Sequence, residues 1–136
     1  MNETHIVNNF LVMGNNVGIG TMSPDEKLTV KGKIHTQEVR VDMSGALVPD
    51  YVFAEDYKLK SLQEVEEYVK QNKHLPEIPS ASEIEKNGLM LAEMNMNLLK
   101  KMEEMTLYMI EMKKKNEILE NSQTQLEKRI QKIEKK

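Results

Sequence analysis

The last third of the chain carries a regular pattern of apolar positions. From Met102 onward, apolar or amide side chains recur in alternating steps of three and four residues, which is the a/d pattern of a coiled coil. No glycine or proline follows Gly88, so nothing interrupts a helix. We therefore predict one continuous helix over residues 89–136, on the order of 70 Å long.

This stripe of residues, called the seam below, predicts an oligomer interface. Its members are Leu91, Met94, Leu98, Met102, Met105, Met109, Met112, Asn116, Leu119, Gln123, Leu126, Ile130 and Ile133. So narrow a stripe on so long a helix cannot be buried against itself, and other copies of the chain are the simplest source of partner helices. Two alternatives are a single helix packed on its own domain and, for the many methionines, an adaptable binding groove.

The residues in and beside the seam favour parallel helices in register. With Met102 at position a, Asn116 and Gln123 also fall at a, where polar side chains fix register and strand number at some cost in stability. Lys115 at g then faces Glu120 at e of a neighbouring copy. Asparagine at a is frequent in dimers, so the pattern alone leaves two and three strands open.

The first part of the chain predicts short strands. Val17, Ile19 and Thr21 alternate with Gly18 and Gly20, which gives a strand with one branched face and one bare face that another backbone can approach. The same glycines lack the lysine and hydroxyl residue of a phosphate-binding loop, so that function is not expected.

Two more strands are expected further along. Residues 27–34 alternate with apolar side chains on one face, and residues 39–43 repeat the pattern with shifted parity. A bulge or bend near residues 36–38 would produce this shift.

The middle of the chain predicts a small helical module. Residues 51–53 form an aromatic strand or anchor. Ser61 and Glu64 make a capping box that opens a helix, and Ser82 with Glu85 gives a second capping signal. The module's apolar residues are expected to pack on the first turns of the long helix: Leu62, Val65, Val69, Leu75, Ile78 and Ile84, against Leu89, Leu91 and Met94.

Composition narrows the function classes. Only 4% of the 136 residues are aromatic and none is tryptophan, so a single copy has a thin core, which favours oligomerisation. The net charge of −3 comes from 19 basic and 22 acidic residues that are intermixed, which predicts no nucleic-acid binding and no membrane insertion. The chain has no cysteine, which excludes disulfides and thiolate metal sites. The first 20 residues lack a signal-peptide pattern, so we expect synthesis in the cytoplasm without a signal peptide.

Two blocks of sequence carry a family resemblance. The run Gly14–Thr21, with Ser23-Pro24 and Lys27–Gly32 after it, resembles a segment of phage tail-fibre and related bacterial surface-fibre proteins. The second block is similar to the C-terminal region of the same proteins. Its matching residues are Asp50–Phe53, Asp56–Leu59, Ser61-Leu62, Asn72–Pro76, Ile78–Ser80, Asn87-Gly88 and Glu93–Tyr108.

The resemblance spans about residues 12–112 and implies a homotrimer. The expected fold class is α+β, with short β segments intertwined in a shaft-like part (residues 1–45), a small helical tip or chaperone-like module (46–88) and a long parallel coiled coil (89–136). The expected function is a structural fibre or fibre-tip subunit of a phage tail or tail-like particle that drives trimerisation and assembly. Other fibre or baseplate subunits are expected partners, in a virion or an extracellular particle.

Two other functions remain open. A receptor-binding adhesin would contact a cell-surface glycan or protein through exposed loops such as residues 43–57. A self-cleaving intramolecular chaperone would use a serine near the start of the tip module. Ser44 has that place, but it lies in a Met-Ser-Gly turn with no matching protease signature downstream, so we expect a turn residue and no enzyme.

No catalytic, cofactor-binding or metal-binding residues are predicted. His5, His35 and His74 lie far apart and lack ligand spacing, although one histidine from each of three chains ringing an axis is a minor hypothesis. No cofactor is expected. Glu103, Glu104 and Glu111 are expected to form a solvated helix face rather than a catalytic carboxylate pair.

Overall fold

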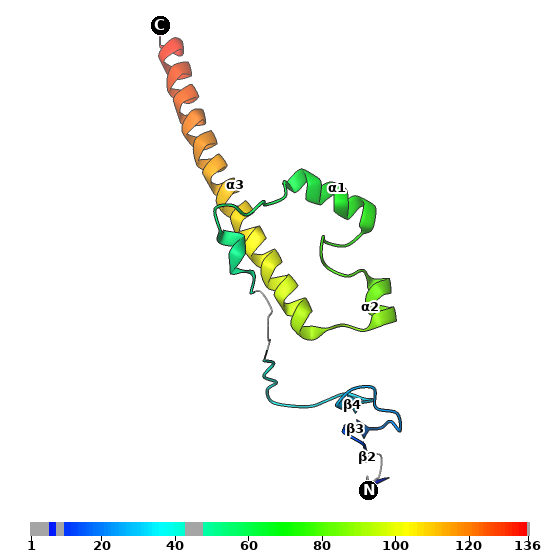
Figure 1. The fold of residues 1–136 in the computed structure, drawn as a ribbon. Helices are drawn as coiled ribbons and strands as arrows, with labels where there is room; N and C mark the ends of the chain where they lie inside the picture. The colour runs from blue at the N-terminus through cyan, green and yellow to red at the C-terminus, as the bar shows by residue number, and fades with distance from the viewer. Residues whose placement is uncertain (1–5, 8–9, 43–47, 136) are drawn as a thin grey trace. The chain divides into compact units, whose positions relative to one another are not determined.

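The chain is a small α+β protein with a sheet near its N-terminus and a long C-terminal helix (Figure 1). A computed structural model describes residues 6–7, 10–42 and 48–135. Two compact units, residues 1–41 and 42–136, make up the chain. The coarse expectation of strands followed by a helical module and a long helix is confirmed.

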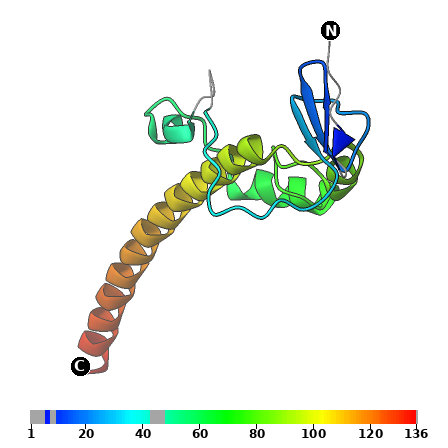
Figure 2. The ribbon, with the colours of Figure 1, turned by 90° about the horizontal axis from the view of Figure 1, so that it is seen from below.

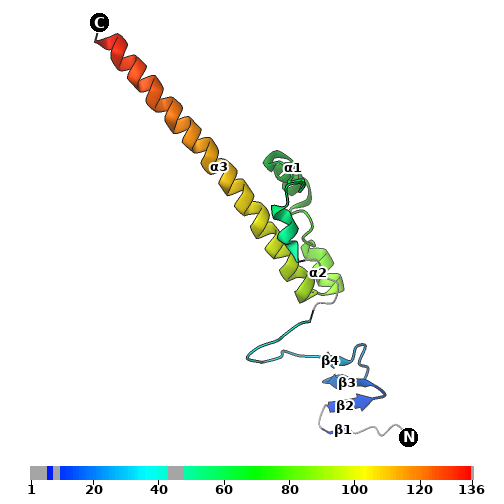
Figure 3. The same ribbon diagram turned by 60° about the vertical axis from the view of Figure 1, so that its left-hand side comes forward.

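The first unit is built on one sheet, whose strands lie side by side in Figures 2 and 3. Its strands are β1 (Ile6–Val7), β2 (Phe10–Met13), β3 (Asn16–Ile19) and β4 (Leu28–Val30), in the order β1-β2-β3-β4. The first three pair antiparallel, and β4 lies parallel to β3. Leu11 in β2 is buried and forms the centre of this small core.

Gly14 and Gly18 in the first unit are required by turns within the chain itself. Gly14 has a φ of 62° in the tight turn between β2 and β3, a conformation that glycine adopts without strain. A Cβ on Gly18 would lie 2.6 Å from the backbone oxygen of Thr21, so the bare position accommodates the following turn of the same chain. The predicted strand therefore exists, and in the single chain the bare position of Gly18 is occupied from within.

The two later strands of the first unit are shorter or missing. The expected strand over residues 27–34 is reduced to β4, and residues 39–42 form no strand, while Met43 lies outside the described residues. Ile34, Val39 and Val41 are exposed. A strand needs a neighbour for its backbone N–H and C=O groups, and in the described part of one chain no strand pairs with this stretch.

The second unit begins with η1, a 3-10 helix over Pro49–Phe53. A strand was expected here and is wrong, because proline at the start of the segment fixes φ in the helical range and favours a first helical turn. The expected anchor is confirmed: Val52 is only 1% exposed, and η1 packs against the long helix α3 (Leu91–Glu134).

The helix α1 (Leu62–Asn72) begins as predicted. Glu64 N–H donates to the Ser61 hydroxyl over 3.2 Å, and Ser61 N–H donates to the Glu64 carboxylate over 2.7 Å. This capping box satisfies two backbone donors that the first turn leaves free.

The helix α2 (Ala81–Asn87) begins two residues earlier than predicted. Its capping box is Ser80 with Glu83, not Ser82 with Glu85. Both pairs have the same spacing, so the sequence signal fits either one. The structure uses the earlier cap, and α2 is therefore two residues longer than predicted before Gly88 ends it.

The helix α3 confirms the predicted uninterrupted helix, with 44 residues and a length of about 66 Å. Its C-terminal part extends alone beyond the rest of its unit (Figure 1). Among the described residues, no helix is long and apolar enough to span a membrane.

The expected packing of α1 and α2 on the first turns of α3 is wrong, although the loop between them does lie against α3 through Glu77. Within the described residues, η1 is the element that packs on α3, and neither α1 nor α2 does. No residue of α1 or α2 is buried, and Leu62 is 53% exposed. The apolar face of α1 is short, so polar contacts from the loops around it attach the module instead.

Candidate oligomer interface

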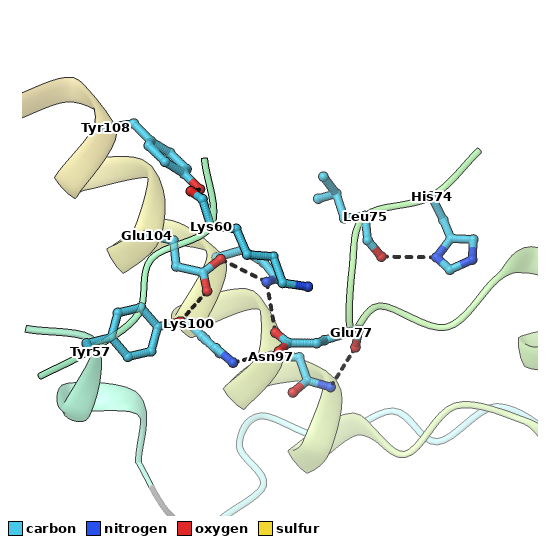
Figure 4. A network of polar contacts seen from close by, with 10 residues as sticks. Tyr57, Lys60, His74, Leu75, Glu77, Asn97, Lys100, Glu104 and Tyr108 are labelled. Carbon is cyan, nitrogen blue, oxygen red and sulfur yellow. Dashed lines mark hydrogen bonds and ion pairs between the residues drawn. The ribbon is translucent and has the colours of Figure 1, made fainter. Parts of the chain in front are cut away.

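The loop between α1 and α2 is fixed to α3 by Glu77 (Figure 4). Its carboxylate accepts a hydrogen bond from Lys100 Nζ at one oxygen and from Lys101 Nζ at the other, each over 2.8 Å. The Asn97 side-chain amide donates to the backbone oxygen of Glu77 over 3.4 Å. One loop residue is thereby held to more than a turn of α3.

The segment before α1 is fixed further along the same helix. The Tyr57 hydroxyl donates to the Glu104 carboxylate over 2.5 Å, and Lys101 Nζ donates to the other Glu104 oxygen over 2.8 Å. The Tyr108 hydroxyl donates to the backbone oxygen of Lys60 over 2.7 Å. Charged groups strengthen several of these bonds.

Ring contacts add η1 to this network. The Tyr51 and Tyr57 rings lie 5.9 Å apart at an angle of 51°. Lys100 Nζ lies 5.8 Å from the centre of the Tyr51 ring, within the range of a cation–π contact. The same lysine therefore contacts both η1 and the loop that carries Glu77.

The network shifts the ionisation of its members. Partial burial raises the pKa of Glu77, but the hydrogen bonds from Lys100 and Lys101 outweigh it and hold the pKa below its usual value. For both lysines, burial lowers the pKa, and the bonds to the carboxylates outweigh it, so the pKa is raised. Burial, together with the bond to Glu104, raises the pKa of Tyr57. These shifts keep the acidic and basic partners charged.

The expectation of a solvated glutamate face is wrong for Glu103 and Glu104. The Glu104 side chain is 14% exposed and bonded to Tyr57 and Lys101. The Oε2 atom of Glu103 is buried and finds no hydrogen-bond partner in the described part of the chain. The expectation holds for Glu111, whose exposed carboxylate pairs with Lys115 over 2.7 Å.

The polar network has a sequence signal that was missed. Four of its five α3 members, Asn97, Lys101, Glu104 and Tyr108, recur in steps of four, three and four, and Lys100 lies beside them. At about 100° per residue, this row runs roughly a quarter turn around the helix from the seam. A second stripe parallel to an apolar seam is therefore a signal for a surface that binds the chain's own module.

The structure leaves the predicted seam uncovered. Apart from Met94, which is half-buried, every apolar seam residue is exposed, from 43% for Leu98 to 73% for Ile133. Asn116 and Gln123 are exposed as well.

The other side of the same stretch of α3 is covered. Leu99, Glu103 and Leu107 are half-buried, whereas all described residues of α3 from Met109 onward are exposed. The half-buried positions therefore reflect cover by the module rather than shielding by helical neighbours. The module packs on one side of α3 and leaves the seam open.

Polar groups near the seam already have contacts within the single chain. Gln123 Nε2 donates to the Glu127 carboxylate over 3.2 Å. Lys115 pairs with Glu111, so a bridge to Glu120 of another copy must compete with this pair. An open groove of about 470 Å³ follows the seam past Met109, Met112 and Asn116, among others.

The remaining candidate residues are not brought together. His74 contacts the backbone oxygen of Leu75 over 3.0 Å and meets the Tyr68 ring edge-on at 5.6 Å between centres. His35 is exposed, and His5 and Ser44 lie outside the described residues. Within the described ranges, no group of three or more histidine and acidic side chains is placed to hold a metal ion.

Comparison of the chain with protein-family models, curated proteins and solved structures gave no significant match. The geometry itself defines the class of protein: a small α+β chain whose long helix carries its own module on one side and an uncovered seam of coiled-coil type on the other.

Proposed function

We propose that the chain is a structural fibre or fibre-tip subunit of a phage tail or tail-like particle, which assembles as a parallel homotrimer through α3. The helix brings three copies together in register and so raises the local concentration of their N-terminal segments for slow β pairing. The role is assembly rather than catalysis, and other fibre or baseplate subunits are the expected partners.

The open seam is the observation that carries this proposal. Most of the surface of α3 is polar. From Met109 onward its described residues are all exposed, so contacts within the chain add little to the stability of this part of the helix. Full burial of a leucine, isoleucine or methionine side chain stabilises by about 1.5–3 kcal/mol. Covering the row from Leu98 to Ile133 therefore supplies the stability that one copy lacks.

The first unit is consistent with the same proposal. Ile34, Val39 and Val41 are exposed along a stretch with the strand pattern but without a strand partner in one chain. Neighbouring copies would supply that partner by pairing edge to edge. The resemblance to tail-fibre proteins favours three chains over two, and it favours a virion or an extracellular tail-like particle as the location.

Light scattering coupled to size exclusion tests the proposal on the full chain. We expect a mass of three chains at micromolar concentration. A truncation that ends at Gly88 removes α3 and is expected to give monomers or aggregates. A soluble trimer from that truncation, or a well-folded monomer of the full chain, refutes the assembly role.

A second candidate function rests on exposed aromatic residues. Phe53 is 54% exposed at the end of η1, and aromatic rings are enriched in recognition surfaces. The chain would then be an adhesin module that contacts a cell-surface glycan or protein. Loss of host-cell binding in Phe53→Ala with an unchanged trimer mass supports this function, and unchanged binding argues against it.

A further inference from the structure

The helical module leaves a groove open beside the seam. This groove of about 420 Å³ lies between α1, α2 and the first turns of α3, and its lining includes Tyr68, Pro79, Met90 and Met94. A helix of 11 residues such as α1 is marginal in water on its own, and no residue of α1 is buried. The module therefore gains stability if something fills the groove.

The module lies on one defined flank of the seam. With Leu91 as position a, Met90 and Asn97 fall at g. Two successive steps of four, from Met94 to Leu98 and from Leu98 to Met102, shift the heptad frame, and with Met102 as a, Lys101 and Tyr108 fall at g as well. Asn97, Lys101 and Tyr108 bond to the module through their side chains, and Met90 lines the groove. The g flank of α3 thus carries the module along its whole covered length.

The e flank of α3 is bare. Asn95 and Thr106 fall at e, and both are exposed. In a parallel coiled coil, a g residue of one helix faces the e residue about five positions further along in the neighbour. Met90 therefore faces Asn95 of the neighbouring copy, which brings the bare flank of that copy to the mouth of the groove.

We propose that the groove receives the e flank of α3 from the neighbouring copy. Each module then holds two long helices: its own through Glu77 and Tyr57, and the neighbour's through the groove. The occupant is a second copy because the groove is continuous with the seam, with Met94 belonging to both. This inference rests on the proposed parallel oligomer and adds that the module itself is part of the interface.

The absence of cysteine from the sequence allows a direct test. Two single-cysteine variants, Tyr68→Cys in the groove and Asn95→Cys on the e flank, are given different affinity tags, co-expressed and treated with a short bis-maleimide. A 68–95 adduct can form only between copies. We expect it as the main cross-linked species, and mass spectrometry of the linked peptides identifies it.

Lys70→Cys is the matched control, because this side chain is 69% exposed on the opposite side of α1. It should give no adduct with position 95. If circular dichroism shows that Tyr68→Cys is unfolded, Asn87→Cys, which also lines the groove, replaces it.

A third variant, Asn116→Cys, tests the parallel oligomer without the groove. Cysteines at a in parallel, in-register helices lie close enough to oxidise to a disulfide between copies. A 116–116 disulfide without a groove adduct overturns the inference and leaves the oligomer standing. Failure of the 116–116 disulfide overturns both, and equal adduct yields from positions 68 and 70 also overturn the inference.

Discussion

The Tyr57 hydroxyl donates a 2.5 Å hydrogen bond to the carboxylate of Glu104, which lies 47 residues further along the chain. This contact connects the segment before α1 to the middle of α3. It lies on the side of α3 that the module covers, away from the seam, so the bond fixes the module without using any seam residue.

Removing that hydroxyl should loosen the module. Tyr57→Phe keeps the ring and loses a bond to a charged acceptor, which costs about 1.5–3 kcal/mol. Chemical denaturation at matched protein concentration measures the change. Tyr51→Phe is the control, because Tyr51 shows ring contacts but no hydroxyl hydrogen bond among the described residues, and it should change stability by less. Equal losses in both variants would contradict a specific role for the bond.

Stability should fall in acid. The pKa of Glu77 is held below its usual value of 4.5, since its two lysine bonds outweigh burial, and those of Glu64 and Glu83 are lowered by their serine caps. The unfolded chain therefore binds more protons than the folded chain as the pH falls below 4.5, and the contribution of these groups is lost there. Denaturation midpoints from pH 7 to pH 3 measure this loss. A Glu77→Gln variant should show a shallower acid slope, and an unchanged slope would rule out the Glu77 contribution.

Two neighbouring residues test whether an effect on assembly comes from the seam or from any exposed apolar side chain. Leu119 at d and Ile118 at c are both 65% exposed in the single chain. Leu119→Asp places a charge in the seam and should abolish the oligomer at micromolar concentration, because burying an unpaired carboxylate is costly. Ile118→Asp should leave the mass from light scattering unchanged. The interface assignment fails if the two variants behave alike.

The polar seam residue Asn116 should lower the stability of the proposed coiled coil and fix its register and strand number. Asn116→Val is expected to raise the thermal midpoint and to give a mixture of oligomer sizes, because an apolar a position no longer selects register and strand number. Asn121→Val, at the outer f position, is the control and should keep a single size. Thermal melts and sedimentation velocity measure the two effects. A single unchanged oligomer with a lower midpoint would show that Asn116 lies outside the seam.

The chain should stay intact after expression. Ser44 is expected to be a turn residue, so intact-mass spectrometry should give the mass of all 136 residues. Loss of the first 43 residues that is prevented by Ser44→Ala would instead assign the chain to the self-cleaving chaperones.

Local sequence signals were enough to predict where the helices lie. The continuous α3, the Ser61–Glu64 cap and the seam spacing depend on neighbours within four residues, which the sequence displays directly. Where two local signals were equal, the sequence did not decide. Ser80 and Ser82 each precede a glutamate at the same spacing, and the structure uses Ser80.

The sequence by itself determined the long helix, the cap of α1 and the row of apolar positions that favours self-assembly. Only the tertiary structure decided which side of α3 is covered, because that depends on contacts such as Tyr57 with Glu104 and Glu77 with Lys100. These contacts join residues more than 20 positions apart, and their geometry follows from how the loops close rather than from any local pattern.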